Sequence, residues 1–447
     1  MQRQKTVAKW LAVVLLITLS VGCYVVYDAF VAGSRGGASA GDGAPPAGSP
    51  EEDEILVPPP SEFPRSADSY LGLTVSHIGG EGDDIARAAV FAGDKTAVFF
   101  SSDSRGHDAA GEGMYLALMT DSELLSVTRI EGGAGETPVA AANTGSGVLL
   151  LTKSDEGCAA RLFGTDFRLL SRAEIPSFDD ALIRTYDGVT RVFYIDSRGI
   201  NSGTLSASAT LLPDQNFLPG SYAKLHECYA ADGVYSLIAA SDAQGLTVAE
   251  FTQNGGFKVR YSAKNRSFVQ FVPLATDEGA GFAMLSSDGS GLRLGAFSPG
   301  GEETASADID GAANGYLFSD GNTLRVLAGG RLYTYCRHLD TVTQRESARI
   351  DGELLFSLRV ERGELFGVAE GGSVAVYSFA DDSDLPLLLL SAEGTPEGKC
   401  FAASDRDSLR LVLSTRSDKD MFAANFGGAD AFFVTLSTEE SGVRGGG

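Results

Sequence analysis

Short apolar segments alternate with turn residues over most of the chain, from residue 69 to residue 438. The residues between the apolar segments are mainly Gly, Asp, Ser and Asn, which favour turns. No stretch of this block keeps an apolar period of 3.6 residues for long, as amphipathic helices would. The pattern therefore predicts an all-β domain built from many short strands.

One hairpin pattern recurs eight times in this block, as a tight turn followed by an apolar strand. Asp-Gly and related dipeptides favour the two-residue turns that join antiparallel strands. The turns are Asp94-Lys95, Ser146-Gly147, Asp187-Gly188, Asp232-Gly233, Glu278-Gly279, Asp320-Gly321, Arg362-Gly363 and Asp407-Ser408. The strand after the turn is Ala97-Val98-Phe99-Phe100 in the first copy and Leu411-Val412-Leu413 in the last.

The spacing of these copies indicates the architecture. Successive turns lie 41 to 52 residues apart, and a four-stranded propeller blade takes about 40–50 residues. A parallel β-helix would repeat at about half this length, and an immunoglobulin-like array at about twice this length. The period therefore predicts a β-propeller of about eight four-stranded blades, with seven blades as the alternative.

The two ends of the block complement each other. The last copy stops after three strands, at residues 431–436, whereas one extra segment, residues 70–78, precedes the first full copy. That segment ends in Ile78-Gly79, and the last strands of several other copies also end in Ile with Gly close behind. We therefore expect residues 70–78 to supply the fourth strand of the last blade, which closes the ring.

The last copy also carries a family resemblance. It reads Ser417-Asp418-Lys419-Asp420 and then Gly-Gly-Ala-Asp-Ala-Phe-Phe-Val-Thr-Leu over residues 427–436. This resembles the repeat of bacterial secreted β-propeller proteins, whose units carry a Ser/Asp turn and end in G-G-x-D-A-F-V-x-K-L. The first copy matches more loosely, the middle copies depart from the pattern, and Thr435 replaces the Lys. The resemblance implies a propeller fold and an exported location, and no common reaction.

The N-terminal region has a different character. Residues 10–27 are uncharged and mostly apolar, and as a helix they would span about 27 Å, close to the hydrocarbon thickness of a bilayer. Arg3, Lys5 and Lys9 precede the run, so the positive-inside rule places the N-terminus in the cytoplasm. The sequence predicts a cytoplasmic tail (1–9), a transmembrane signal anchor (10–31) and a propeller held outside the cell membrane.

Two other interpretations of this run stay open. A cleaved signal peptide would need a small-x-small site after the apolar run, which instead continues as Tyr24-Val25-Val26-Tyr27. A lipoprotein signal would lipidate Cys23, but Ser20 stands where the bacterial motif prefers Leu. Residues 32–68 are rich in Gly, Ala and Pro with an acidic run at 51–54, which predicts a disordered tether. Residues 439–447 are expected to form a disordered tail.

The charge balance excludes one class of partner. The chain has 35 basic and 59 acidic residues, a formal net charge of −24. A nucleic-acid binder needs a basic stripe that displaces counterions, and the domain shows none. The only tryptophan, Trp10, precedes the domain, which disfavours sugar and quinone sites that stack ligands on indole rings.

Sequence motifs for catalysis are equally scarce. The cysteines of the domain, Cys158, Cys228, Cys336 and Cys400, are far apart and form no zinc pattern. The histidines form no H-x-H or H-E-x-x-H unit, and the chain has no P-loop and no G-x-S-x-G elbow. We therefore expect no metal and no cofactor, with calcium as the one ion left open.

A set of aspartates follows the second strand of many copies, as Ser-Asp or its reverse. In a propeller the loops after these strands share one face with the blade-to-blade connections, which are also acidic, for example at Asp84, Glu136 and Asp180. The ordinary explanation is that Asp and Ser suit turns. The sharper hypothesis is an acidic face that binds cations or a basic partner. Its candidate residues are Asp103, Asp155, Asp196, Asp242, Asp288 and Asp418.

Two functions fit these features. The first is a membrane-tethered, extracytoplasmic interaction module without catalytic activity, whose partner is an unknown protein or small ligand. The alternative is a propeller hydrolase or lyase with its site at the central channel, where one innermost strand per blade converges. The charged residues that the repeat places on those strands are Arg87, Arg184, His226 and Arg359.

Overall fold

The computed structural model describes residues 73–106, 109–132, 135–186, 189–206, 208–231, 235–252, 255–276, 279–319, 323–347, 350, 352–360, 363–370, 373–378, 388–390, 396–404, 408–418, 422, 425 and 427–437. The chain divides into two compact units, Met1–Glu54 and Ile55–Gly447, and all described residues belong to the second. The predicted tail, anchor and linker lie outside these ranges. Within them, no helix is both long enough and apolar enough to cross a membrane.

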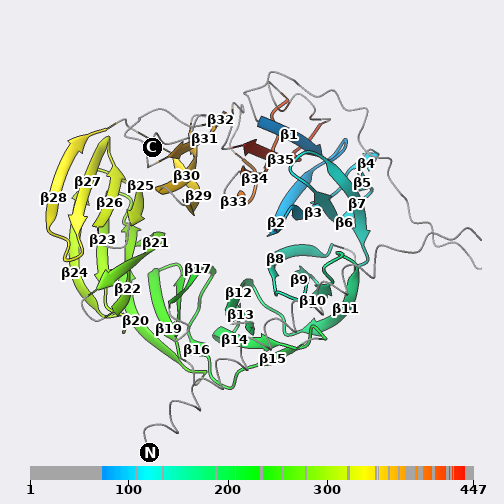
Figure 1. Ribbon diagram of the computed structural model, residues 1–447. Coiled ribbons are helices and arrows are strands. Elements are labelled where there is room, and N and C mark those ends of the chain that lie inside the picture. Colours follow the sequence, from blue (N-terminus) through cyan, green and yellow to red (C-terminus); the bar gives the residue numbers. More distant parts are fainter. Residues whose placement is uncertain are drawn as a thin grey trace, which may run out of the picture. The chain divides into compact units, whose positions relative to one another are not determined.

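Eight antiparallel sheets form a ring, so the chain is an eight-bladed β-propeller (Figure 1). Each blade is numbered in chain order, and its strands run from the inner edge outward. Blades 1 to 4 contain β2 (Asp84–Ala92), β3 (Lys95–Ser102), β6 (Gly113–Met119) and β7 (Leu124–Ile130); β8 (Thr137–Asn143), β9 (Val148–Ser154), β10 (Gly157–Phe163) and β11 (Leu169–Ile175); β12 (Asp180–Tyr186), β13 (Val189–Asp196), β14 (Gly199–Leu205) and β15 (Leu211–Pro213); and β17 (Lys224–Ala231), β18 (Tyr235–Ser241), β19 (Gly245–Phe251) and β20 (Phe257–Lys264).

The second half of the ring repeats this order. Blades 5 to 8 contain β21 (Ser267–Thr276), β22 (Gly279–Ser287), β23 (Gly291–Phe297) and β24 (Glu303–Asp310); β25 (Gly315–Ser319), β26 (Thr323–Ala328), β27 (Arg331–Cys336) and β28 (Thr341–Glu346); β29 (Glu353–Val360), β30 (Gly363–Glu370), β31 (Ser373–Ser378) and β32 (Leu388–Leu390); and β33 (Phe401–Ser404), β34 (Ser408–Thr415), β35 (Asp430–Ser437) and β1 (Leu73–Ile78). Three short strands add to this plan: β16 (Leu218–Pro219), which pairs with β14, and the pair β4 (Arg105–Gly106) and β5 (Ala109–Ala110).

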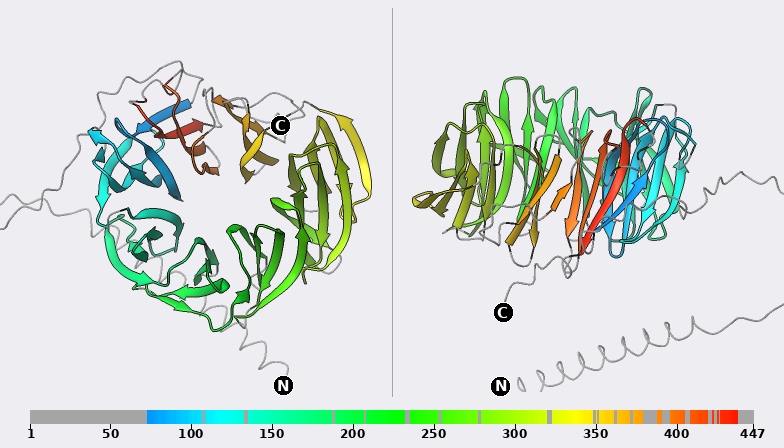
Figure 2. Two further views of the ribbon diagram at one scale, coloured as in Figure 1. Left: turned by 180° about the vertical axis from the view of Figure 1, so that it is seen from behind. Right: turned by 90° about the horizontal axis from the view of Figure 1, so that it is seen from above.

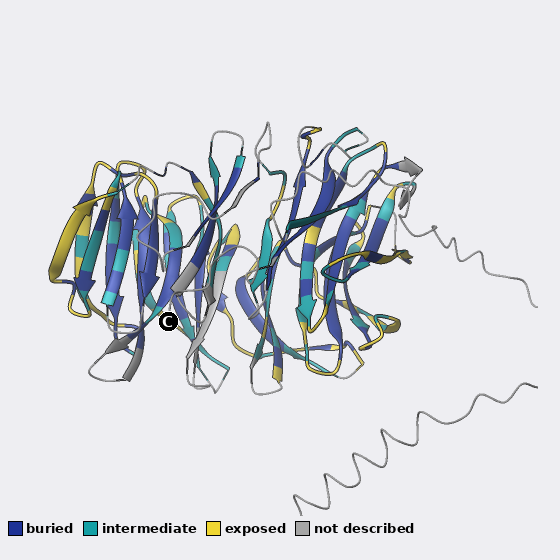
Figure 3. Cartoon of the chain, turned by 45° about the horizontal axis from the view of Figure 1, so that its top comes forward, coloured by how far each residue is buried: buried dark blue, intermediate teal, exposed yellow. Residues whose placement is uncertain are grey.

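The second strand of each blade is the most buried, because it has a strand on either side and a neighbouring blade over each face. Val98 and Phe100 of β3 are fully buried and pack with Val412 and Phe433 of blade 8. Each buried side chain of this size contributes roughly 1.5–3 kcal/mol by leaving water. Exposure increases toward the rim, where outer strands alternate between exposed and partly buried residues (Figure 3).

The predicted closure of the ring is confirmed. Strand β1 pairs antiparallel with β35, from Leu73 opposite Leu436 to Ile78 opposite Ala431. The first strand of the domain thus becomes the outermost strand of the last blade, and no covalent bond is needed to close the circle. Seen from the side, the strands run from one face of the ring to the other (Figure 2). All loops therefore lie on one of two faces.

The predicted turns fall between the first and second strands, but some details were wrong. In blade 1, Ala92 pairs with Lys95, so the turn is Gly93-Asp94 and not Asp94-Lys95. Gly93 has φ +61°, a conformation that glycine adopts at little cost. In blade 2, Asn143 pairs with Val148, so the turn has four residues instead of two.

Candidate functional site

The loops between the second and third strands and the loops between blades are neighbours, as predicted. The Asp83 amide, between β1 and β2, donates to Asp103 Oδ1 at 2.6 Å, and the Asp103 amide donates to the Asp83 carbonyl at 3.2 Å. In blade 5, Ser287 Oγ donates to the carbonyl of Ala313, which precedes blade 6, at 2.8 Å. We call the end of the ring formed by these two sets of loops the loop face.

Three of the six predicted aspartates accept hydrogen bonds from their own turns. Asp242 Oδ1 accepts the amides of Gln244 and Gly245 at 2.6 and 2.9 Å. Asp196 accepts the amide of Arg198 at 2.8 Å and also pairs with its guanidinium. Both carboxylates thus hold the loop that carries them, as the ordinary explanation for Asp in turns expects.

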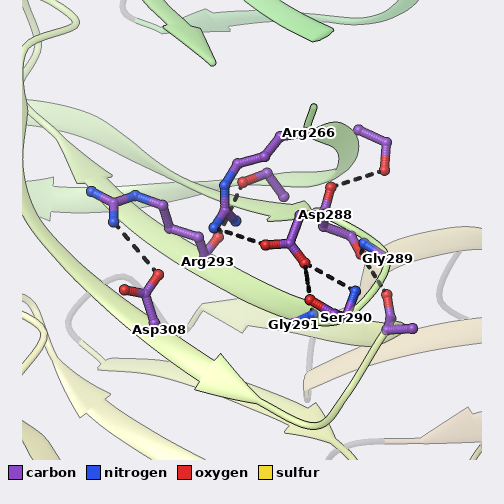
Figure 4. A network of polar contacts seen from close by, with 11 residues as sticks. Arg266, Asp288, Gly289, Ser290, Gly291, Arg293 and Asp308 are labelled. Atoms are coloured by element: carbon purple, nitrogen blue, oxygen red, sulfur yellow. Dashed lines mark hydrogen bonds and ion pairs between the residues drawn. The ribbon is translucent and has the colours of Figure 1, made fainter. Parts of the chain in front are cut away.

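Asp288 shows this arrangement most fully (Figure 4). Its Oδ1 accepts the Ser290 amide and hydroxyl at 2.9 Å and the Gly291 amide at 2.8 Å, and its Oδ2 lies 3.4 Å from Arg266 Nη2. These donors stabilise the ionised carboxylate and lower its pKa to about 2. Asp288 is therefore negatively charged at any physiological pH.

The other three aspartates occupy different environments. Asp103 accepts the Asp83 amide and so joins two loops, and Asp103 itself is exposed. Asp155 and Asp418 are exposed. Which of the six contact a ligand stays a prediction, but their placement on the loop face follows from the strand order.

Two acidic residues of the blade connections, Asp84 and Glu136, are not on the surface, contrary to expectation. Glu136 is buried and forms an ion pair with the fully buried Arg161 of β10, whose Nη2 lies 2.8 Å from Glu136 Oε2. The Thr152 hydroxyl also donates to Glu136, and Arg161 Nη2 donates to the Glu131 carbonyl at 3.0 Å. This network joins the connection to the second and third strands of blade 2.

Two innermost strands donate backbone N–H groups to side chains of the preceding blade. Ser414 Oγ of blade 8 accepts the Ala86 amide of blade 1 at 2.9 Å. Asp180 Oδ2 of blade 3 accepts the Leu225 amide of blade 4 at 2.9 Å. The innermost strand has no inner neighbour, so these side chains satisfy donors that the sheet itself leaves unpaired.

The predicted channel residues lie on innermost strands, as expected, and belong to four different blades. Arg87 and His226 occupy equivalent positions, since each is the residue at which the register with the second strand shifts. Arg184 and Arg359 lie closer to the hairpin turn, opposite Arg191 and Glu364. Arg87 and Arg184 are exposed.

His226 is held in place by its neighbours. Its Nε2 lies 2.8 Å from Ser241 Oγ of β18, and its ring packs on Phe268 of blade 5 with 5.3 Å between centroids. Burial lowers its pKa to about 4, and the nearby Lys224 acts in the same direction. The imidazole is therefore neutral at physiological pH and helps to join blades 4 and 5.

A buried polar cluster at the closure of the ring was missed by the sequence analysis. His77 Nε2 of β1 lies 2.7 Å from Asp430 Oδ2 of β35, and both side chains are buried. Asp84 of blade 1 is also fully buried and accepts the Ser104 hydroxyl and the Gly80 amide. A Cβ on Gly79 would lie 2.7 Å from Asp430 Oδ1 and 2.9 Å from Asp84 Oδ2, so both carboxylates border this glycine.

The pKa of Asp84 in this cluster shifts in the opposite direction from that of Asp288. Burial raises the pKa of Asp84, and the negative charge of Asp430 raises it further, against the effect of the Ser102, Ser104 and Gly80 donors. Asp84 Oδ1 is buried and has no hydrogen-bond partner within the described residues. The sequence predicted residues 76–79 only as the end of a strand. Their contact with Asp430 was not predictable, because Asp430 lies 353 residues from His77.

The described part of the chain contains no group of three or more His, Cys, Asp or Glu side chains arranged to hold a metal ion. Cys158, Cys336 and Cys400 have free thiols. Burial raises the pKa of the Cys158 and Cys400 thiols, the latter to about 12. The Cys158 and Cys400 thiols are therefore protonated and poor nucleophiles.

Comparison with known proteins supports the fold and goes no further. No family model and no curated protein sequence matches the chain. Among solved structures, Sqt1 of Saccharomyces cerevisiae is similar with a TM-score of 0.53 and 9% identity, over 82% of this chain and 98% of that one. The Dos1 propeller is similar with a TM-score of 0.51 and 10% identity, over 80% of this chain and 94% of that one.

A third solved structure has weaker similarity. The virginiamycin B lyase of Staphylococcus aureus, solved with quinupristin, gives a TM-score of 0.43 and 8% identity over 81% of this chain and 99% of that one. Identities this low show the fold alone, and no family or repeat type is identified by them. The chain is an eight-bladed β-propeller.

Proposed function

We propose that this chain is a non-catalytic protein-interaction or ligand-binding module, tethered by residues 10–31 to the cell membrane with its propeller on the outside. The apolar run after three basic residues supports the tether and its orientation. The rigid ring supports the interaction role, since it presents eight sets of loops on a fixed frame. The resemblance of the last copy to secreted bacterial propellers agrees with an exported location.

One observation carries the non-catalytic part of the proposal. Several polar side chains of the inner strands and the loop face are engaged in holding the fold. His226 joins blades 4 and 5, Asp180 joins blades 3 and 4, and Asp242 and Asp288 cap their own turns. These contacts make the loop face rigid, which lowers the entropy cost of binding a partner there.

The charge of the loop face suggests the chemistry of its partner. The net charge of −24 attracts basic molecules at long range, and the exposed Asp155 and Asp418 and the permanently ionised Asp288 lie on this face. We therefore infer a basic protein surface or a cation as the ligand of the loop face. Rim charges of this kind mainly increase the association rate.

The test removes charge and keeps the turns. Asp155, Asp196, Asp242 and Asp288 are replaced together by Asn, whose side-chain oxygen can still accept the turn amides. The matched control replaces four acidic residues in turns at the opposite face: Asp94, Glu123, Asp166 and Glu302 by Asn or Gln. Each protein serves as bait against solubilised membranes of the source organism, and bound partners are identified after cross-linking.

The expected result is a partner that binds the natural chain and the control quartet, and binds the loop-face quartet at least tenfold more weakly, with a lower association rate. Equal binding by both quartets would contradict a basic partner at the loop face. Turnover of a substrate that stops on replacing His226 would contradict the non-catalytic assignment altogether.

A further inference from the structure

Three segments of the chain meet where the ring closes: the end of β1, the start of β2 and the start of β35 (Figure 1). His77 Nε2 of β1 lies 2.7 Å from Asp430 Oδ2 of β35. The Asp84 amide of β2 donates to the Ala429 carbonyl, just before β35, at 2.5 Å. We call these four residues, together with the neighbouring Gly79, the closure junction. It joins two parts of the domain that are far apart in the sequence.

Strand β1 is a place where the ring can open. Among the described strands it pairs only with β35, over six residues. Its first four residues are half-buried, whereas His77 and Ile78 at its end are buried. Two consecutive glycines, Gly79 and Gly80, follow the strand. Segments with few buried contacts open first in native proteins, so the closure junction holds the buried end by which β1 stays attached.

The junction also buries two carboxylates close together. Asp84 and Asp430 are fully buried, and His77 is 7% exposed. A Cβ on Gly79 would lie within 2.9 Å of an oxygen of each carboxylate, so both border one small space. The imidazole of His77 is charged only when it is protonated. While it is neutral, the three side chains carry up to two negative charges, and two carboxylates in one buried site oppose the ionisation of both.

Other charged side chains of the loops around Asp84 are exposed or form ion pairs with one another. They are Glu81, Asp83, Asp103, Glu397, Lys399, Arg416 and Asp418. Arg416 pairs with Asp83 and with Glu397 and not with the buried carboxylates. The charged group that acts on the ionisation of Asp84 is therefore Asp430, which is negative.

We propose that the closure junction is a proton-dependent switch, in which protonated Asp84 keeps β1 closed and ionised Asp84 favours the opening of β1. The closed junction holds Asp84 away from water and beside Asp430, whereas opening hydrates it and separates the two carboxylates. A state that hydrates a buried carboxylate is favoured when that carboxylate is ionised. The attachment of β1 thus responds to pH separately from the rest of the ring.

Closure should weaken as the pH rises. Burial and the charge of Asp430 raise the pKa of Asp84 above its ordinary value of 3.8. Its contribution to closure is therefore complete below pH 3.8 and is lost as the pH rises through the higher pKa of the closed state. Asp288 behaves in the opposite way, because its turn donors lower its pKa to about 2. The support that Asp288 gives to its turn is thus unchanged in the range where closure weakens.

Hydrogen exchange of the full-length chain in detergent measures the opening of β1 directly. Protection factors of residues 73–78 are determined at several pH values from 4.5 to 7.5, relative to the intrinsic exchange rate at each pH. Strand β22 of blade 5, on the far side of the ring, is the internal reference. We expect the protection of β1 relative to β22 to fall at least threefold over this range.

Three variants assign the effect to one side chain. Asp84→Asn does not titrate and keeps an oxygen that can accept the Ser104 and Gly80 donors, so its β1 protection should not fall as the pH rises. Asp103→Asn changes a neighbouring exposed carboxylate and should keep the fall of the natural chain. His77→Gln removes the other titrating group of the junction, can still donate to Asp430, and should also keep the fall.

Several outcomes would overturn the proposal. A constant ratio of β1 to β22 protection in the natural chain would do so, whatever the variants show. A fall that persists in Asp84→Asn, or that disappears in His77→Gln alone, would assign the pH dependence to another group. Equal protection of β1 and β22 at every pH would mean that the ring opens as a whole. The partner of the loop face is a separate question, which the aspartate quartet tests by itself.

Discussion

Burial shifts the pKa values of two residues on the inner side of the ring, in opposite directions. It lowers that of His226 to about 4 and raises that of Asp84. The cause is the same, because a low-polarity environment disfavours the charged form of either group. Burial thus favours the neutral form of each residue, and both residues couple the stability of the propeller to pH.

Replacing Asp84 by Asn should remove a pH-dependent cost. Because the folded protein raises the pKa of Asp84 above its ordinary value of 3.8, this group favours folding most below pH 3.8. Its contribution is lost as the pH rises through the higher pKa of the folded state. Urea unfolding at several pH values from 3.5 to 7 should show the natural chain losing stability relative to Asp84→Asn as the pH rises.

The comparison between the two proteins reports on Asp84 together with its interaction with the neighbouring Asp430, since the rest of the sequence is the same in both. Asn can still accept the Ser104 and Gly80 donors. A difference in stability that stays constant over this pH range would show that Asp84 is ionised as easily in the folded chain as in the unfolded one.

His226→Gln should have the opposite pH dependence. The folded-state pKa of about 4 lies below the ordinary value of 6.5, so this histidine favours folding above pH 6.5. That contribution is lost as the pH falls toward 4. Gln can keep a hydrogen bond to Ser241 and does not titrate. The natural chain should therefore lose stability relative to the variant between pH 6.5 and 4, and NMR titration of the ring should give a midpoint near 4. A midpoint near 6.5 would contradict this account.

At the scale of elements, the strands were predictable and their polar links were not. Each second strand is a short apolar run because both of its faces are covered, as Val98 and Phe100 illustrate. Asp between apolar segments predicts a turn, and Asp242 and Asp288 do accept backbone amides of their own turns. The sequence around Glu136 has the same acidic character, but its contact with Arg161 depends on two strands that meet only after folding.

The Arg161–Glu136 pair should be among the most sensitive sites of blade 2. Arg161 is fully buried, so Arg161→Leu leaves the carboxylate of Glu136 without its counter-charge in the interior. Breaking such a pair costs about 3–5 kcal/mol. We expect a loss of this size in the free energy of unfolding, measured in urea.

The exposed ion pair of Arg168 with Asp166 offers the control, because both side chains are largely in solvent. Arg168→Leu should change the free energy of unfolding by less than about 1 kcal/mol. Equal effects of the two substitutions would mean that Arg161 is hydrated in solution and that the buried network does not hold the connection to blade 2.

At the scale of the whole molecule, the repeat determines where the loops lie. A ring of eight blades puts every second-to-third-strand loop on one face, so the position of Asp103 or Asp418 follows from strand order alone. The closing contacts cannot be derived in this way. His77 and Asp430 are far apart in the chain and meet only because β1 completes blade 8.

The acidic character of the loop face follows from the same cause. The loop face collects acidic residues because turns favour Asp, and the ring gathers those turns in one place.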